Sequence, residues 1–193
     1  MASVLTEATA PPAKSAGVTA SEYADMPEGP NPTELIEGEV VDLNLPTRRH
    51  GQVAGRAFRY LDRFCEETDF GHAVINDAGF LVGEDPDTVR GPDVQVISYA
   101  KIPKGPLPDE YDDVPPDVAV EVRSRTDRWR GLMSKATQFL DAGAGCVLVL
   151  DPDSASARVF YPDAPNEVFT SGQTLTLGDA LPGFEVAVAD LFA

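Results

Sequence analysis

Two carboxylates lie in apolar segments that are typical of buried strands. Asp93 follows Arg90-Gly91-Pro92 and begins the alternating run Asp93–Tyr99, where Pro92 restricts the backbone and presents the carboxylate at a strand entrance. Glu121 lies inside Val118-Ala119-Val120-Glu121-Val122. An ionised carboxylate is costly in such a strand unless it pairs with a cation or a metal.

If these strands are neighbours, the two carboxylates and the Val122 carbonyl form an all-oxygen pocket. Mg²⁺ or Mn²⁺ prefers such ligands, and either ion can polarise a phosphoryl oxygen and activate water for hydrolysis. No CxxC or HExxH motif indicates zinc instead. A structural interpretation stays open, in which Asp93 caps a turn and Glu121 pairs with Arg123, Arg90 or Lys135.

Two cations follow Glu121 closely in the sequence. Strand alternation predicts that Arg123, two residues on, shares a face with Glu121. Lys135 lies between Leu132 and Phe139 in a helical pattern, at the margin of the inward stripe, from which its amine could reach the sheet. Either residue could instead be a salt-bridge partner or a solvated side chain.

The hydrophobic pattern predicts an α/β fold: a mixed β-sheet core flanked by two long helices. Long helices are expected at about 47–68 and 127–142, and a short capped helix begins at Thr19. Strands are expected at about 34–43 with a turn at Gly38, and at 72–75, 79–82, 93–99, 117–122, 146–150 and 158–161, with two more before the C-terminus. Residues 1–18 are expected to be a disordered tail, and 19–193 a single domain.

Composition limits the possible functions. The net charge of −17 opposes binding to a polyanion unless metal ions or a local basic patch reverse the field. No segment approaches the roughly 18 consecutive apolar residues of a membrane span. Cys65 and Cys146 lie in apolar patterns and are expected to be buried thiols, which indicates a reducing, cytoplasmic location.

Several stretches, taken together, resemble the Uma-type restriction endonucleases of the PD-(D/E)xK superfamily. Pro92-Asp93 and Glu121-Val122-Arg123 look like the superfamily signature, with Arg in place of the usual lysine. The other matching stretches are Glu34–Glu39, His50, Arg90–Val94, Pro115–Ser124, Lys135, Val149–Pro152 and Leu181–Phe184. The resemblance covers nearly all of residues 19–193.

The resemblance implies that Asp93 and Glu121 are metal ligands and that Lys135 replaces the missing strand lysine. Arg123 departs from the pattern, because guanidinium can clamp a phosphate but is a poor proton acceptor. Glu39 is the preferred candidate for a further carboxylate, ahead of Glu37, and His50 could approach the site from the first long helix.

Three functions remain open. The first is a metal-dependent endonuclease that hydrolyses DNA and could act as a homodimer. The second is a binding or regulatory module on the same fold that has lost turnover. The third is a phosphodiesterase for a smaller substrate. Clustering of arginines around Asp93 and Glu121 would favour the nuclease.

Overall fold

The computed structural model describes residues 17–27 and 29–193. The expected disordered tail, residues 1–18, therefore lies outside the described residues except for Gly17 and Val18. The Val18 N–H donates to the Gly38 carbonyl at 2.9 Å. None of the helices in the described ranges is both long and apolar enough to cross a bilayer.

Six strands form the central sheet. Their order is β10 (Glu167–Thr170), β9 (Ser156–Phe160), β8 (Cys146–Asp151), β7 (Val118–Val122), β6 (Val94–Ser98) and β3 (Gly71–Ile75). Neighbours run antiparallel except β7 and β8, which are parallel. The expected mixed sheet is confirmed.

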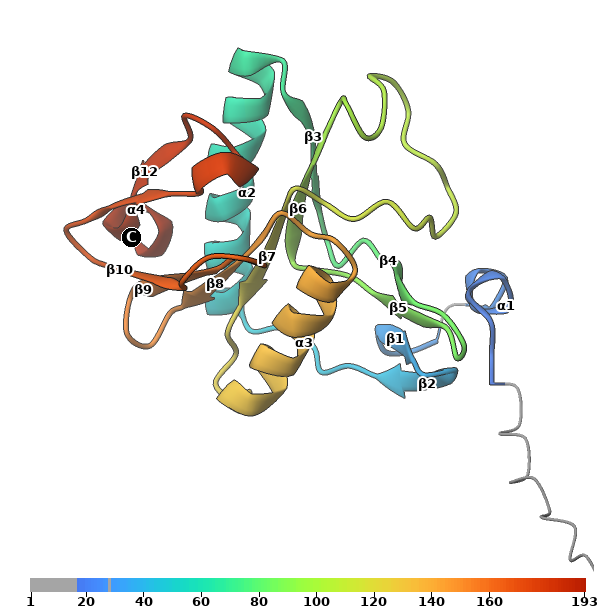
Figure 1. Cartoon of the computed structure of the whole chain (residues 1–193). Helices are drawn as coiled ribbons and strands as arrows, with labels where there is room; N and C mark the ends of the chain where they lie inside the picture. The colour runs from blue at the N-terminus through green and yellow to red at the C-terminus, as the bar shows by residue number, and fades with distance from the viewer. Residues whose placement is uncertain (1–16, 28) are drawn as a thin grey trace, which may run out of the picture.

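The two long helices cover opposite faces of this sheet (Figure 1). Helix α2 (Arg48–Thr68) packs with Val118, Val120 and Val122 of β7, whereas α3 (Trp129–Asp141) packs in the cluster that contains Ala119. Successive residues of a strand point to opposite faces. Residue 121 of β7 therefore shares the α3 face with Ala119.

Local sequence explains where these helices begin and end. The Thr47 hydroxyl caps α2 by accepting from the His50 N–H, and Asp69 ends the helix in the left-handed conformation. Helix α3 has no side-chain cap at its start. Gly143, with a φ of 102°, follows the C-cap of α3 and prevents the helix from continuing.

A second, four-stranded antiparallel sheet lies beside the first. Its order is β2 (Glu39–Asp42), β1 (Thr33–Ile36), β5 (Thr88–Arg90) and β4 (Phe80–Gly83). The turn expected at Gly38 is present, and Glu37 and Gly38 both have positive φ. The short strand β5 and its pairing with β1 were not expected from the sequence.

The remaining elements lie at the two ends of the chain. Helix α1 (Ala20–Ala24) has the expected Thr19 cap, which forms a capping box with Glu22. Strands β11 (Thr174–Thr176) and β12 (Glu185–Ala187) pair, the 3₁₀ turn η1 (Gly178–Ala180) lies between them, and α4 (Val188–Phe192) packs on α2. Cys65 and Cys146 are buried free thiols, as expected.

Candidate active site

A cleft of about 630 Å³ opens between the two sheets and the start of α3. Both sheets, α2, α3 and five loops contribute to its wall. Of the residues considered for the site from the sequence, His50, Asp93, Glu121, Val122 and Lys135 line the cleft, whereas Arg123, Glu37 and Glu39 do not. The lining also includes Glu34, Asp77, Arg90, Arg125 and Arg128.

Glu121 lies at the inner end of this cleft. Its residue is only 7% exposed, and its Oε1 is 2.8 Å from the Lys135 Nζ. Lys135 is therefore the ion-pair partner of this buried oxygen. Burial raises the pKa of Glu121 to about 7, with Asp93 and Glu34 adding repulsion and Lys135 opposing it.

Asp93 lies one residue before β6 and is joined to β7 by a backbone hydrogen bond. The Val122 N–H donates to Asp93 Oδ2 at 2.6 Å, which ties the carboxylate to the residue after Glu121. His50, from the first turn of α2, places Nε2 3.4 Å from the same oxygen. Burial opposes charge on His50, but the hydrogen bond and the charge of Asp93 outweigh it and raise its pKa.

Lys135 reaches the cleft from the face of α3 that packs on the sheets. Its Nζ donates to the Gly91 carbonyl at 2.9 Å and lies 3.0 Å from Glu34 Oε1, in addition to the contact with Glu121. Burial would lower the pKa of Lys135, but the charges of Glu121 and Glu34 outweigh it and raise the pKa. Lys135 is therefore a charged ammonium and a poor proton acceptor.

Glu34 and Arg90 complete the charge cluster, and neither was singled out for the site from the sequence. Glu34 in β1 is 4% exposed, and Arg90 at the end of β5 directs Nε and Nη2 to its Oε2 at 2.9 and 2.7 Å. The available signal was a glutamate beside the apolar pair Leu35-Ile36. Asp77, from the loop after β3, also lines the cleft and was not predicted.

Arg123 does not line the cleft. Its Nη1 lies 3.1 Å from Asp151 Oδ1 at the end of β8, and its guanidinium lies 5.3 Å from the centre of the Trp129 ring. Strand β7 ends at Val122, so the alternation that would place Arg123 beside Glu121 does not continue. Its contacts hold the segment between β7 and α3.

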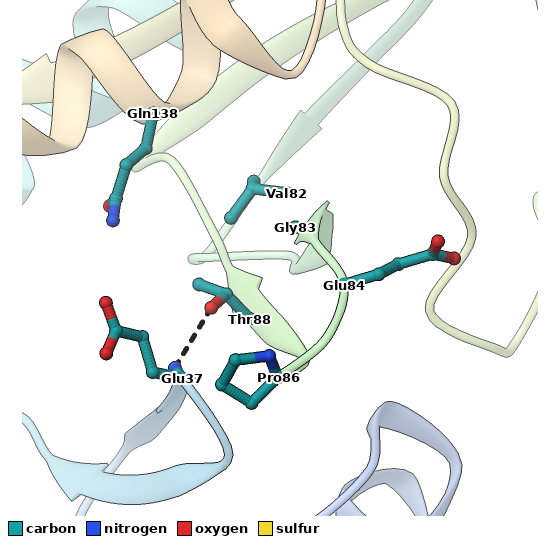
Figure 2. A pocket seen from close by; sticks show the side chains of 7 residues that line it. All are labelled: Glu37, Val82, Gly83, Glu84, Pro86, Thr88 and Gln138. Atoms are coloured by element: carbon teal, nitrogen blue, oxygen red, sulfur yellow. Dashed lines mark hydrogen bonds between the residues drawn. The ribbon is translucent and has the colours of Figure 1, made fainter. Parts of the chain in front are cut away.

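Glu39 and Glu37 also lie away from Asp93 and Glu121. Glu39 is exposed on β2, and Glu37 lines a separate hollow of about 260 Å³. Figure 2 shows this hollow, with Glu37 from the β1–β2 turn and Gln138 from α3 on the same side. Gln138 also accepts from Arg90 Nη1 at 2.7 Å and so connects the hollow to the cleft's charge cluster.

The arginines divide into two groups. Arg125 and Arg128, between β7 and α3, line the cleft with Arg90, whereas Arg56 donates to the Asp190 carbonyl at the far end of the chain. Arg59 and Arg63 lie over Tyr60 on α2. The cleft thus carries three arginines and Lys135 among six carboxylates, which are Glu34, Asp42, Asp77, Asp93, Glu121 and Asp127.

The residues of the cleft fit a divalent cation that takes part of its coordination from water and substrate. The described residues contain no group of three or more His, Cys, Asp or Glu side chains able to hold a metal ion. Asp93, Glu121 and the Val122 carbonyl would hold the ion, because all three bring oxygen ligands to the same cleft. Mg²⁺ commonly binds through one or two carboxylates and keeps several waters.

This fold, with its carboxylate cleft at the sheet's edge, belongs to the restriction-endonuclease-like α/β class. A family model described as "Uma2: Putative restriction endonuclease" matches residues 20–189. The chain belongs to the Uma2 family, which confirms the resemblance seen in the sequence and supports a nuclease function.

A solved structure shares the fold. It is described as "a putative nuclease belonging to DUF820" from Anabaena variabilis ATCC 29413, and it is 20% identical with a TM-score of 0.78. The similarity covers 91% of this chain and 97% of that chain. No curated protein matches this chain.

Proposed function

We propose that this protein is a metal-dependent endonuclease that hydrolyses phosphodiester bonds of DNA. The observation that carries the proposal is that Asp93, Glu121 and Lys135 line one cleft although they come from three different elements. The two carboxylates would hold a divalent cation, which would supply Lewis acidity and an activated water when bound.

The cleft's own residues have distinct roles in this proposal. The charged Lys135 faces the negative charge that develops on the transferring phosphoryl group, where a preorganised cation lowers the barrier. Arg125 and Arg128 bind flanking phosphates at the cleft wall. Arg123 acts indirectly, because its ion pair with Asp151 holds the segment that carries them.

Cleavage of plasmid and single-stranded DNA with Mg²⁺, with Mn²⁺ and with a chelator tests the proposal. We expect cleavage that requires metal and is lost in Asp93→Asn and Glu121→Gln. Glu185→Gln serves as the matched control, because Glu185 is an exposed carboxylate on β12 far from the cleft. Loss of activity in the control as well would contradict a specific role for the cleft carboxylates.

Metal binding has a separate readout. An ion that binds only the folded protein raises its stability by about 2.7 kcal/mol at 100 times Kd. We expect millimolar Mg²⁺ to raise the Tm of wild type and of Glu185→Gln but not that of Asp93→Asn. An unchanged wild-type Tm at saturating metal counts against the site.

The net charge of −17 favours a second function, a nuclease-fold module that binds a partner without turnover. Such a module would bind metal or nucleic acid and leave every DNA, RNA and small phosphodiester substrate intact. Wild-type protein that shows a metal-dependent rise in Tm, yet no cleavage in any metal, would favour this alternative.

A further inference from the structure

Glu34 stands out because it is a buried carboxylate that the proposed hydrolysis does not use. Arg90 contacts Oε2 with two nitrogens, which leaves Oε1 directed at the Lys135 ammonium 3.0 Å away. This Oε1 is buried, and the Lys135 ammonium is its ion-pair partner. The carboxylate therefore lies between a fixed guanidinium and the ammonium.

Two residues of α3, three positions apart, contact this arrangement from one helix face. Gln138 accepts from Arg90 Nη1 at 2.7 Å, and Lys135 contacts Glu34 at 3.0 Å. Helix α3 is thus joined to the second sheet through Glu34 and Arg90. The same contacts set where the Lys135 amine lies relative to the cleft.

Glu121 and Glu34 both contact Lys135, but a bound divalent cation would weaken only the contact with Glu121. A divalent ion on Glu121 competes with Lys135 for that carboxylate and repels the ammonium. Glu34 is only 4% exposed and is already paired on Oε2 with Arg90, so its Oε1 remains available to Lys135.

We propose that Glu34 is the positioning residue for Lys135: its carboxylate, held by Arg90, keeps the ammonium in the cleft when Glu121 binds a cation. The inference deepens the proposed nuclease function and rests on it for its catalytic consequence. Glu34 itself contacts neither substrate nor the reacting atoms.

The position of Lys135 can be measured without turnover. The sequence contains four lysines, Lys14, Lys101, Lys104 and Lys135, so ¹⁵N-lysine labelling yields a simple ammonium NMR spectrum. We expect a slowly exchanging Lys135 ammonium signal in wild type, with and without Mg²⁺. In Glu34→Gln, the signal should broaden or disappear once Mg²⁺ is added.

Kinetics supplies the second readout. Misplacing a reacting group by about 1 Å can cost about 100-fold in rate. We expect Glu34→Gln to lower kcat about 10-fold to 100-fold, with KM and the Mg²⁺-induced rise in Tm unchanged. Glu39→Gln, on the exposed neighbouring strand, is the matched control and should behave as wild type. Glu34→Asp keeps the charge and withdraws the carboxylate, so it should also lower kcat and serves if Glu34→Gln does not fold.

The outcomes separate the two proposals. Wild type that cleaves nothing overturns the nuclease function, and the NMR signal then still decides whether Glu34 holds Lys135. An unchanged Lys135 signal and unchanged kcat in both Glu34 variants overturn the positioning role while the nuclease stands. A rise in KM and a loss of the Tm response together with the fall in kcat would also overturn it, because the damage to the cleft would then be general.

Discussion

At the scale of single residues, the cleft depends on one buried cation between carboxylates. Lys135→Met leaves Glu34 and Glu121 facing each other without their shared partner, and removal of one member of a buried ion pair typically costs about 3–5 kcal/mol. We expect a loss of this size in the free energy of unfolding by urea. Adding Glu34→Gln to Lys135→Met should recover part of that loss.

The same double variant tests catalysis in a folded protein. Loss of one preorganised electrostatic contact slows catalysis about 100-fold to 1,000-fold. We expect the double variant to retain its Mg²⁺-induced rise in Tm and to lose cleavage by that factor. Cleavage close to that of wild type would remove Lys135 from the mechanism.

Asp151 gives a prediction for pH. Burial opposes its ionisation, but hydrogen bonds from Ser154, Arg123 and the Asp153 N–H outweigh burial and hold the pKa of Asp151 below its ordinary value. A depressed carboxyl pKa stabilises the fold above the unfolded pKa, and that stability is lost as pH falls through the folded pKa. Asp151→Asn should therefore be less stable than wild type at neutral pH, and the difference should shrink as pH falls below the ordinary pKa of an aspartate.

Urea unfolding of both proteins from pH 7 down to about pH 3 measures this difference. Asp163→Asn is the control, since Asp163 is exposed and should show no such pH-dependent difference. A gap between wild type and Asp151→Asn that stays constant with pH would show that the carboxylate's charge does not contribute.

At the scale of elements, the segment that joins β5 to β6 carries three contributions to the cleft. Arg90, the Gly91 carbonyl and Asp93 follow one another there, and a Cβ at Gly91 would overlap the backbone of Asp77. Overpacking of this kind typically costs about 1–3 kcal/mol. We expect Gly91→Ala to lower the Tm and to abolish the Mg²⁺-induced rise in Tm. The reason is that Asp93 and the Gly91 carbonyl, which accepts from Lys135, would shift together.

Gly55→Ala in α2 is the control for Gly91→Ala. No atom lies within 4 Å of an added Cβ there, and alanine favours a helix over glycine by up to about 1 kcal/mol. Its Tm should be equal to or above that of wild type. Thermal unfolding with and without Mg²⁺ measures both variants.

The elements also mark how far sequence reasoning reaches. The alternation of β7 and the stripes of α2 and α3 follow local periodicity, so the placement of Glu121 and Lys135 on one face could be predicted. Glu34 could not, because its partner Arg90 is 56 positions away and belongs to the unexpected strand β5. The positive φ of Glu37 and Gly38 makes a turn that places Glu39 on a different strand from Glu34. Strand alternation does not predict the position of Arg123, because β7 ends at Val122.

At the scale of the whole molecule, the distribution of charge determines how the proposed nuclease would bind DNA. The net charge of −17 repels a polyanion at long range, whereas Arg125 and Arg128 attract phosphates only within the cleft. Salt screens both the repulsion and the attraction, with a Debye length of about 10 Å at 0.1 M. Because the two effects oppose each other, DNA affinity should fall much less steeply with salt than it does for a basic nuclease.

Removing the attraction of Arg125 and Arg128 for phosphates should reveal the repulsion that the net charge of −17 causes. Each lost phosphate contact reduces the salt slope by about 1, so Arg125→Ala with Arg128→Ala should leave DNA affinity unchanged or rising with salt. Fluorescence anisotropy in Ca²⁺ at several salt concentrations measures the slope. Arg130→Ala is the control, because Arg130 is exposed on α3 and does not line the cleft. If DNA affinity changes with salt as steeply in the double variant as in wild type, Arg125 and Arg128 do not bind phosphates.

The cleft draws on both sheets and on α3, and this has a consequence for the protein's synthesis. A growing chain contains Asp93 and Glu121 before it contains Lys135 and β8, the parallel neighbour of β7. A domain generally folds as a unit. A ribosome-bound fragment that ends before α3 therefore carries Asp93 and Glu121 without the Lys135 ammonium, and the proposed hydrolysis must wait until α3 and β8 have been made.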